Sequence, residues 1–314
     1  MAVPIIIDTD PGIDDAMAIM LAAASPEVDL LGLVAVAGNV GLDKTAQNAA
    51  ALADLLRLDC PVGRGAAGPL WRRDTMPADH VHGQNGFGGY QLPHSDRTLE
   101  PGLELTARLV SESPEPVTVA AIGPLTNVAG FITHYPELAR KVERFVIMGG
   151  GTRAHLGNVT PAAEFNVYYD PDAAAKLFDF GVPITMVGLN VTETALVGMH
   201  HLPALAKSGG PVAAMIEHMM GRYFDSGAGP DGMSQHDSVA LAAIIQPGLL
   251  ETTHVHVDVE NVGRLTSGMT VVDFKGSTGQ DPNCDVAMSV DVVGFRQLLD
   301  ERLSALDAKL QGSN

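Results

Sequence analysis

Residues 3–24 of this 314-residue chain read VPIIIDTDPGIDDAMAIMLAAA, and they decide how the fold begins. The apolar run from Val3 to Ile7 predicts a strand that is buried on both faces, as in a parallel sheet. The run ends at Asp8, and after a short turn the segment from Asp14 to Ala24 predicts a helix. A strand, an acidic turn and a helix are therefore expected in the first 24 residues.

The same alternation of strand and helix continues to the end of the chain. Further strands are expected at residues 30–37, 117–122, 144–148, 183–189, 252–259, 268–274 and 285–290. Helices are expected at residues 42–58 and 126–142, after the Asp170-Pro171 pair, and at 294–309. This pattern predicts an α/β fold of the Rossmann-like class, with an open, mainly parallel sheet flanked by helices. Because no Pro- or Ser-rich linker divides the chain, we expect one domain over residues 1–314.

The composition excludes several classes of partner. The chain has 19 Lys and Arg against 37 Asp and Glu, a net charge of −18, and 46% of its residues are hydrophobic. Nucleic acids and anionic membranes are not expected as partners, because their phosphates would be repelled. The N-terminus lacks the features of a secretory signal, and no window of about 18 apolar residues predicts a membrane span. We therefore expect a cytoplasmic protein.

Polar residues follow four of the predicted strands, at the edge where open parallel sheets bind ligands. They lie at residues 8–15, at Asn39, in the GPLTN segment at 123–127 and in the GGG segment at 149–151. Two irregular stretches, residues 63–101 and 226–235, contain several Gly and Pro residues. Loops of that length inside a compact domain are often functional.

The turn after the first strand holds four carboxylates, those of Asp8, Asp10, Asp14 and Asp15. Asp14 and Asp15 suit a helix N-terminus, where the helix dipole favours negative charge. That explanation does not cover Asp8 and Asp10, which end a buried strand, where like charges repel and their pKa values rise. A hard divalent cation with oxygen ligands relieves this repulsion, so the cluster predicts a metal site.

Two common motifs fit the cluster poorly. An EF-hand loop needs Gly at its sixth position, but counting from Asp8 places Ile13 there. A phosphatase of the haloacid-dehalogenase type also begins with an apolar strand and Asp-x-Asp, with Asp8 as nucleophile and Asp10 as acid. That family usually has Thr or Val where this chain has Gly12. The phosphatase therefore stays an alternative hypothesis.

The segment DTDPGIDDAMAIMLA at residues 8–22 resembles the N-terminal motif of the nucleoside hydrolases, the inosine–uridine-preferring ribohydrolases. The resemblance continues in the family's order through VAGN at 36–39, HGQNGFG at 82–88, GPLTN at 123–127, MGGG at 148–151, AEFNVYYDPDAA at 163–174, MVGLNVT at 186–192, HDSVA at 236–240 and LTSGMTVVDF at 265–274. An ordered set over nearly the whole chain is far more specific than one motif. It implies the nucleoside hydrolase fold and hydrolysis of the N-glycosidic bond of ribonucleosides to free base and ribose.

The resemblance implies a Ca²⁺ ion held by Asp10, Asp15, Asp237 and the backbone carbonyl of Ile122. Carboxylate and carbonyl oxygens are ligands that suit this ion. The metal would lower the pKa of a bound water, and Asp10 would take its proton as general base. The water would then attack an oxocarbenium-like sugar. Asn39 is implied beside the catalytic aspartate and the water, and Asp8 is expected to orient its neighbours.

The resemblance also assigns residues to the nucleoside. Ribose is expected to contact Asp14, Asn158, Glu164, Asn166 and Met148, since each buried hydroxyl needs a polar partner. Phe165 and His82 are expected to face the base, where the aromatic ring of Phe165 can stack. His236 is implied as the acid that protonates the leaving base, because its pKa suits proton donation near neutrality.

Three further expectations concern the loops and the assembly. Residues Met219 to Gln235 are expected to form a lid-like loop whose glycines permit closure, with Tyr223 and Phe224 near the base. The resemblance implies a homodimer or a homotetramer. Besides the phosphatase, a non-catalytic protein that binds ribose or a metal with the same fold stays open as an alternative.

Overall fold

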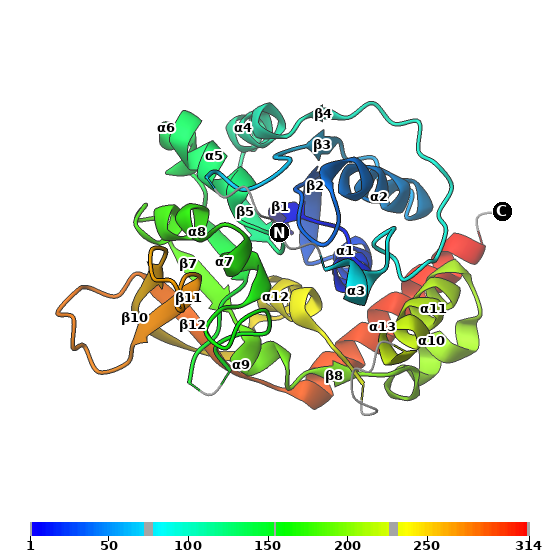
Figure 1. The fold of residues 1–314 in the computed structure, drawn as a ribbon. Coiled ribbons are helices and arrows are strands. Elements are labelled where there is room, and N and C mark those ends of the chain that lie inside the picture. Colours follow the sequence, from blue (N-terminus) through cyan, green and yellow to red (C-terminus); the bar gives the residue numbers. More distant parts are fainter. Residues whose placement is uncertain (1, 72–77, 154, 226–231, 313–314) are drawn as a thin grey trace.

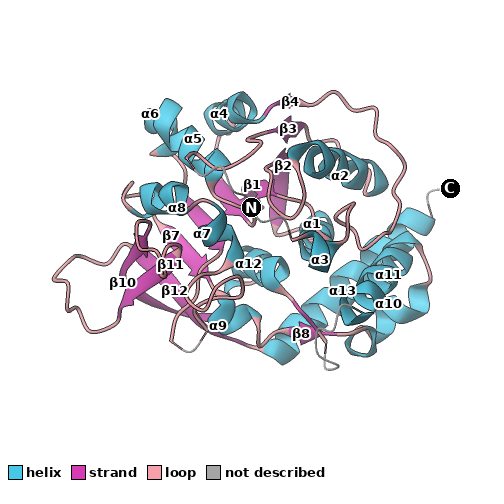
Figure 2. Ribbon diagram, in the orientation of Figure 1, coloured by secondary structure: helices cyan, strands magenta, loops and turns pink. Residues whose placement is uncertain are grey.

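The computed structural model describes residues 2–71, 78–153, 155–225 and 232–312. In these residues a ten-stranded sheet crosses the centre of the molecule, with helices on both faces (Figures 1 and 2). Its strands are β1 (Val3–Thr9), β2 (Val28–Ala35), β3 (Val62–Arg64), β4 (Glu100–Pro101), β5 (Thr118–Ala121), β6 (Arg144–Met148), β7 (Ile184–Val187), β10 (Leu250–Glu260), β11 (Met269–Asp273) and β12 (Cys284–Val290). Their spatial order is β11-β10-β12-β7-β6-β5-β1-β2-β3-β4.

The direction of the strands confirms the predicted sheet. Every neighbouring pair from β12 to β4 is parallel, and β10 runs antiparallel to both β12 and β11. A separate antiparallel pair joins β8 (Leu196–Val197) to β9 (Met233–Ser234). The fold is therefore an α/β fold with a mostly parallel central sheet.

Two hydrophobic clusters hold the helices against the two faces of the sheet. One cluster packs α1 (Ile13–Ala23), α2 (Leu42–Leu55), α10 (Pro203–Ser208), α11 (Pro211–Asp225), α12 (His236–Ile245) and α13 (Val292–Gln311). The other packs α4 (Gly102–Glu112), α5 (Thr126–His134), α6 (Pro136–Ala139) and α8 (Pro171–Phe178). Ile5 and Ile7 belong to the first cluster and Ile6 to the second, because side chains alternate across a strand. This alternation explains why β1 is an unbroken apolar run.

The order of the strands reverses at β1. The chain passes from β1 to β2, β3 and β4 on one side, and then returns to place β5 on the other side of β1. At such a switch point the loops after neighbouring strands diverge and leave a crevice at the carboxyl end of the sheet. The acidic turn after β1 and the GPLTN segment after β5 both lie at this crevice.

Several boundaries differ from the prediction. The helix expected over residues 126–142 is broken into α5 and α6 at Pro136, because a proline disfavours helical backbone in the residue before it. The irregular stretch from 63 to 101 contains the short elements β3, β4 and α3 (Asp79–His82). The described helices include none that is both long and apolar enough to cross a membrane.

The expected lid is also different from a single loop. Residues 219–225 form the last two turns of α11, and Met233–Ser234 form β9, so helix and strand make up most of the described part of the segment. Residues 226–231 lie outside the described part of the chain. Helix continues here because Met219 and Met220 are buried against the first hydrophobic cluster, with Tyr223 and Phe224 packed beside them.

Candidate active site

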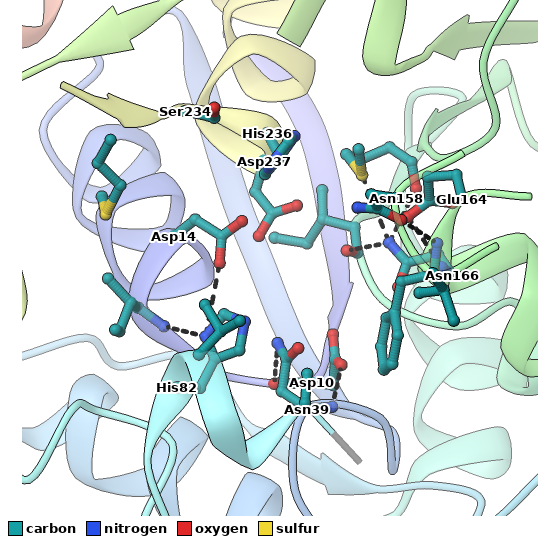
Figure 3. Close-up of a pocket in the computed structure, with 18 of the residues that line it drawn as sticks. Asp10, Asp14, Asn39, His82, Asn158, Glu164, Asn166, Ser234, His236 and Asp237 are labelled. Atoms are coloured by element: carbon teal, nitrogen blue, oxygen red, sulfur yellow. Dashed lines mark hydrogen bonds and ion pairs between the residues drawn. The ribbon is translucent and has the colours of Figure 1, made fainter. Parts of the chain in front are cut away.

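A pocket of about 560 Å³ opens at the carboxyl end of the sheet. Its walls come from segments far apart in the sequence, as Figure 3 shows: Asp10 and Asn39 on one side, His236 and Asp237 opposite, and Glu164 and Asn166 across from Asp14 and His82. All the substrate-contacting and catalytic residues that the sequence predicts line this pocket: Asp10, Asp14, Asn39, His82, Met148, Asn158, Glu164, Phe165, Asn166 and His236. The prediction that these residues, far apart in the sequence, share one site is therefore consistent with the structure.

Asp15 organises the turn between β1 and α1. Its carboxylate accepts hydrogen bonds from the hydroxyl of Thr9 at 2.5 Å, the amide of Gly12 at 2.9 Å and the side-chain amide of Asn39 at 3.1 Å. Burial, and then the nearby charge of Asp14, raises the pKa of Asp15 to about 6. The hydrogen bonds offset part of the free-energy cost of burying this charge, and so they stabilise the carboxylate at the buried N-terminus of the helix.

Asp10 is held from two sides. Its Oδ2 accepts a hydrogen bond from the main-chain amide of Asn39 at 2.6 Å, while the Asn39 side chain donates to the Asp10 carbonyl at 3.2 Å. A Cβ atom on Gly38 would lie 2.0 Å from Oδ2, and one on Gly123 would lie 2.6 Å from Oδ1. The glycines of the VAGN and GPLTN motifs thus make room for this carboxylate. Burial and the charge of Asp15 raise the pKa of Asp10 well above its usual range.

Three carboxylates form a candidate cation site. One oxygen from each of Asp14, Asp15 and Asp237 lies within 4.8 Å of the other two, and Figure 3 shows Asp14 and Asp237 pointing toward each other. Oδ1 of Asp14 is buried and makes no hydrogen bond within the described structure. Burial and the charges of Asp14 and Asp15 raise the pKa of Asp237 well above its usual range. A divalent cation with oxygen ligands fits this arrangement. It would relieve the repulsion among the three carboxylates and give Oδ1 of Asp14 a partner.

The cation cluster only partly matches the ligand set expected from the sequence. Asp15 and Asp237 belong to both sets, whereas Asp14 replaces Asp10 among the grouped oxygens. Asp10 remains close enough to raise the pKa of Asp237. The carbonyl of Ile122 accepts a hydrogen bond from Asn166 at 2.9 Å, which leaves one of its two lone pairs.

Glu164 and Asn166 are fixed at the start of α7 (Phe165–Tyr169). Glu164 caps this helix and accepts from the amides of Asn166 at 2.9 Å, Val167 at 3.2 Å and Gly150 at 3.0 Å. Burial outweighs these bonds and raises the pKa of Glu164 to about 7. The GGG segment after β6 therefore serves the site by donating a main-chain amide to this carboxylate.

The amide of Asn166 has one possible orientation. Its nitrogen donates to the carbonyls of Ile122 at 2.9 Å and Met148 at 3.0 Å, so both hydrogens are used and Oδ1 remains as an acceptor. Asn158 lies in the same wall, where its Oδ1 accepts from the amide of Phe165 at 3.0 Å. This part of the pocket offers several acceptors and apolar surface, which suits a sugar with hydroxyl groups.

Two histidines also line the pocket, His82 beside Asp14 and His236 beside Asp237. The amide of Ile13 donates to Nδ1 of His82 over 3.1 Å, so that nitrogen carries no proton. Nδ1 of His236 lies 2.8 Å from the hydroxyl of Thr192. Thr192 stands in the MVGLNVT motif, but the motif alone does not indicate which side chain Thr192 contacts, so the sequence predicts no role for it.

Asp8 lies outside the pocket lining. Its Oδ2 accepts from the side chain of Asn127 at 2.9 Å, and its Oδ1 is buried without a partner in the described residues. Burial raises the pKa of Asp8 to about 8. A nucleophile of the haloacid-dehalogenase type would have to face the substrate, so this position does not favour the phosphatase alternative.

The comparison with known families agrees with the geometry. Residues 5–297 match the family described as inosine-uridine preferring nucleoside hydrolase. The chain belongs to the nucleoside hydrolase family. It is an enzyme that hydrolyses ribonucleosides, so neither the phosphatase nor the non-catalytic alternative is favoured.

Curated relatives and solved structures cover nearly all of this nucleoside hydrolase. The pyrimidine-specific ribonucleoside hydrolase RihA of Citrobacter koseri is 43% identical over 311 residues, which are 97% of this chain and 99% of that protein. The purine-preferring ribonucleoside hydrolase from Gardnerella vaginalis superposes with a TM-score of 0.90 at 30% identity, covering 98% and 99% of the two chains. A plant nucleoside hydrolase superposes with a TM-score of 0.90 at 33% identity, covering 97% and 100%. These matches confirm the predicted family and fold.

Proposed function

We propose that this nucleoside hydrolase cleaves pyrimidine ribonucleosides, such as uridine and cytidine, to the free base and ribose in a Ca²⁺-dependent reaction. The observation that carries the proposal is one pocket that is lined by the carboxylates of Asp10, Asp14 and Asp237, by the possible sugar partners Glu164 and Asn166, and by His236. The pyrimidine preference is supported by relatives of 43% identity that are named pyrimidine-specific, against 30% for the purine-preferring structure.

Ca²⁺ would be held by Asp15 and Asp237, with Asp10, Asp14 and the carbonyl of Ile122 around them. The grouped oxygens of the three carboxylates support this, as does Oδ1 of Asp14, which accepts no hydrogen bond from a described residue. A shell of carboxylates and a carbonyl with varied directions suits the larger, more flexible Ca²⁺ better than octahedral Mg²⁺. When bound, the ion would neutralise the buried charge and activate a water for attack.

Asp10 is the proposed general base. Its Oδ2 is fixed by the Asn39 amide, and the carboxylate lines the pocket, where it can take a proton from a bound water. Asp14, Asn158, Glu164 and Asn166 would hold the ribose hydroxyls through their oxygens, with Met148 against the sugar. Fixing the ribose next to Asp10 removes much of the entropy cost of bringing the water and the anomeric carbon together.

His236 is the proposed acid for the leaving base, with His82 and Phe165 as further contacts to it. Charge develops on the base as the glycosidic bond breaks, so a donor placed there lowers the barrier. His236 and His82 both line the pocket, which supports this assignment. Tyr223 of α11 also lines the pocket and is proposed to cover the bound base.

The experiment measures ribose release from uridine, cytidine, inosine and adenosine, and phosphate release from p-nitrophenyl phosphate. The purified protein is assayed after treatment with a chelator, and again after Ca²⁺ or Mg²⁺ is added back. We expect the fastest release from uridine or cytidine, lost on chelation and restored best by Ca²⁺. Faster cleavage of inosine contradicts the base preference, and full activity in chelator contradicts the metal requirement.

The assembly and the location also remain proposals. We propose a homodimer or homotetramer in solution. Sedimentation equilibrium would test this by measuring the mass of the assembly, which should be two or four times the 32.8 kDa of one chain. A cytoplasmic location is likewise proposed, and cell fractionation would test it. A monomer over the working concentration range would contradict the first proposal.

A further inference from the structure

Thr192 and His236 are joined through their side chains although 44 residues separate them. Thr192 is the last residue of α9 (Leu189–Thr192) and has no exposed surface. Its hydroxyl oxygen lies 2.8 Å from Nδ1 of His236, the first residue of α12. The main-chain amide of Thr192 is used within its own helix, donating to the carbonyl of Gly188 at 3.1 Å. The side chain is therefore the part of Thr192 that reaches the active site.

The direction of this hydrogen bond follows from the available partners. Among the described residues, the Thr192 hydroxyl has no partner other than Nδ1 of His236. A buried hydroxyl must donate its hydrogen, because an unsatisfied donor costs about 1–3 kcal/mol. Nδ1 is then the acceptor, and the proton of the neutral imidazole sits on Nε2. Nε2 is the ring nitrogen that remains for a ligand in the pocket.

Main-chain hydrogen bonds hold the segments that carry Thr192 and His236 next to each other. The amide of Gln235, just before His236, donates to the carbonyl of Ala195 at 3.2 Å. The pairing of β8 with β9 continues this contact, with Leu196 opposite Ser234. The segment after α9 and the segment before α12 thus form one unit, and the hydroxyl of Thr192 adds the contact that orients the ring itself.

We propose that Thr192 is a positioning residue for the leaving-group step: its hydroxyl orients the His236 imidazole and keeps the N–H on Nε2, where it donates a hydrogen bond to the base as the glycosidic bond breaks. This inference rests on the proposed role of His236. Thr192 does not line the pocket, so it acts on the nucleoside through His236. Its loss should therefore slow bond cleavage while leaving ribose binding almost unchanged.

The test compares T192V, which keeps the shape and removes the hydroxyl, with T192S, which keeps the hydroxyl. T118V is the matched control, because Thr118 is a buried threonine of β5 whose hydroxyl has no partner in the described structure. We expect T192V to lower kcat on uridine about tenfold, a fraction of the 10²–10⁴ of a general acid. KM should change by less than about twofold, T192S should restore most of kcat, and T118V should match the wild type.

Two further readouts separate this role from a structural one. On p-nitrophenyl riboside, whose leaving group needs no acid, T192V should retain the wild-type rate. The ¹⁵N chemical shifts of the His236 ring, assigned with H236Q, should show the Nε2–H tautomer in the wild type and a mixture in T192V. An unchanged tautomer, or equal losses on both substrates, overturns the proposal. If the wild type cleaves no nucleoside, the proposed function fails, and the ring shifts still decide whether Thr192 sets the tautomer.

Discussion

The main-chain amide of Ile13 donates a hydrogen bond to Nδ1 of His82 over 3.1 Å, joining the start of α1 to α3. Amides in the first turn of a helix lack a partner within the helix, so the imidazole satisfies one that would otherwise be buried unpaired. The same bond holds His82 in the pocket wall beside Asp14, whose carboxylate is 3.9 Å from Nδ1.

Substituting His82 with Ala should reduce both stability and turnover. The free amide of Ile13 would cost about 1–3 kcal/mol of unfolding free energy, measurable by urea denaturation. The pocket would also lose a contact to the base, so kcat/KM on uridine should fall. H134A is the control, because His134 is an exposed histidine of α5 away from the pocket. Equal stabilities of H82A and H134A would show that the Ile13 bond contributes nothing.

Gly12 should tolerate no side chain. A Cβ atom there would lie 2.4 Å from Nδ1 of His82 and 2.6 Å from Nδ2 of Asn39. We expect G12A to displace both residues and to lower kcat/KM by at least about tenfold, since small misplacements in an active site cost that much or more. G41A is the matched control, because Gly41 has extended backbone and open space around its Cβ position. Comparable activity of the two variants would contradict the predicted clash.

Replacing Asp8 with Asn should make the protein more stable at alkaline pH. The pKa of Asp8 is raised from 3.8 to about 8 by burial, so the folded state binds its proton more tightly than the unfolded state. Its stabilising contribution is complete below pH 3.8 and is lost as the pH rises through about 8. We expect D8N to have a higher Tm than the wild type at pH 9, with a smaller difference at pH 5.

The exposed Asp29 of β2 supplies the control for this measurement. D29N should leave the dependence of Tm on pH unchanged, with all samples in the same chelator. A wild-type Tm that stays above that of D8N at pH 9 would mean that the Asp8 carboxylate is not destabilising when ionised.

Asp10→Asn should abolish turnover and leave the fold intact. Asn keeps an oxygen that can accept from the Asn39 amide, as Asp10 does at 2.6 Å, but it cannot take a proton from water. Loss of a general base lowers kcat by about 10²–10⁴. Circular dichroism and Tm would check the fold, and a rate within about tenfold of the wild type would remove Asp10 from the role of base.

Ca²⁺ should raise the Tm of the wild type, because a ligand that binds only the native state stabilises it. D237N should lose most of this shift, since it removes one of the three grouped carboxylates. D43N is a control, because Asp43 is an exposed carboxylate of α2 paired with Arg64. A Ca²⁺ shift in D237N as large as that in D43N would place the ion elsewhere.

The sequence predicted most of the fold because its signals are local. The run from Val3 to Ile7 is unbroken since β1 is covered on both faces, and Arg144 to Met148 is a strand for the same reason. The predicted helix over residues 126–142 was wrong because a single residue, Pro136, interrupts a helix that the surrounding pattern would continue. It also missed that α11 extends to Asp225, because burial of Met219 against other helices outweighs a Gly-rich neighbourhood.

The candidate site was predictable as a set of residues but not as an arrangement of atoms. Asp10, Asn39 and Glu164 follow strands of one parallel sheet, so chain order alone indicates that they meet at its carboxyl edge. The sequence by itself thus determined the family and the sheet, and it predicted a set of residues that line one pocket. Tertiary structure decided that Asp14 joins Asp15 and Asp237, that Asp8 turns to Asn127, and that Thr192 reaches His236. These contacts depend on distances of a few ångströms between side chains on different elements, and packing of the whole domain sets such distances.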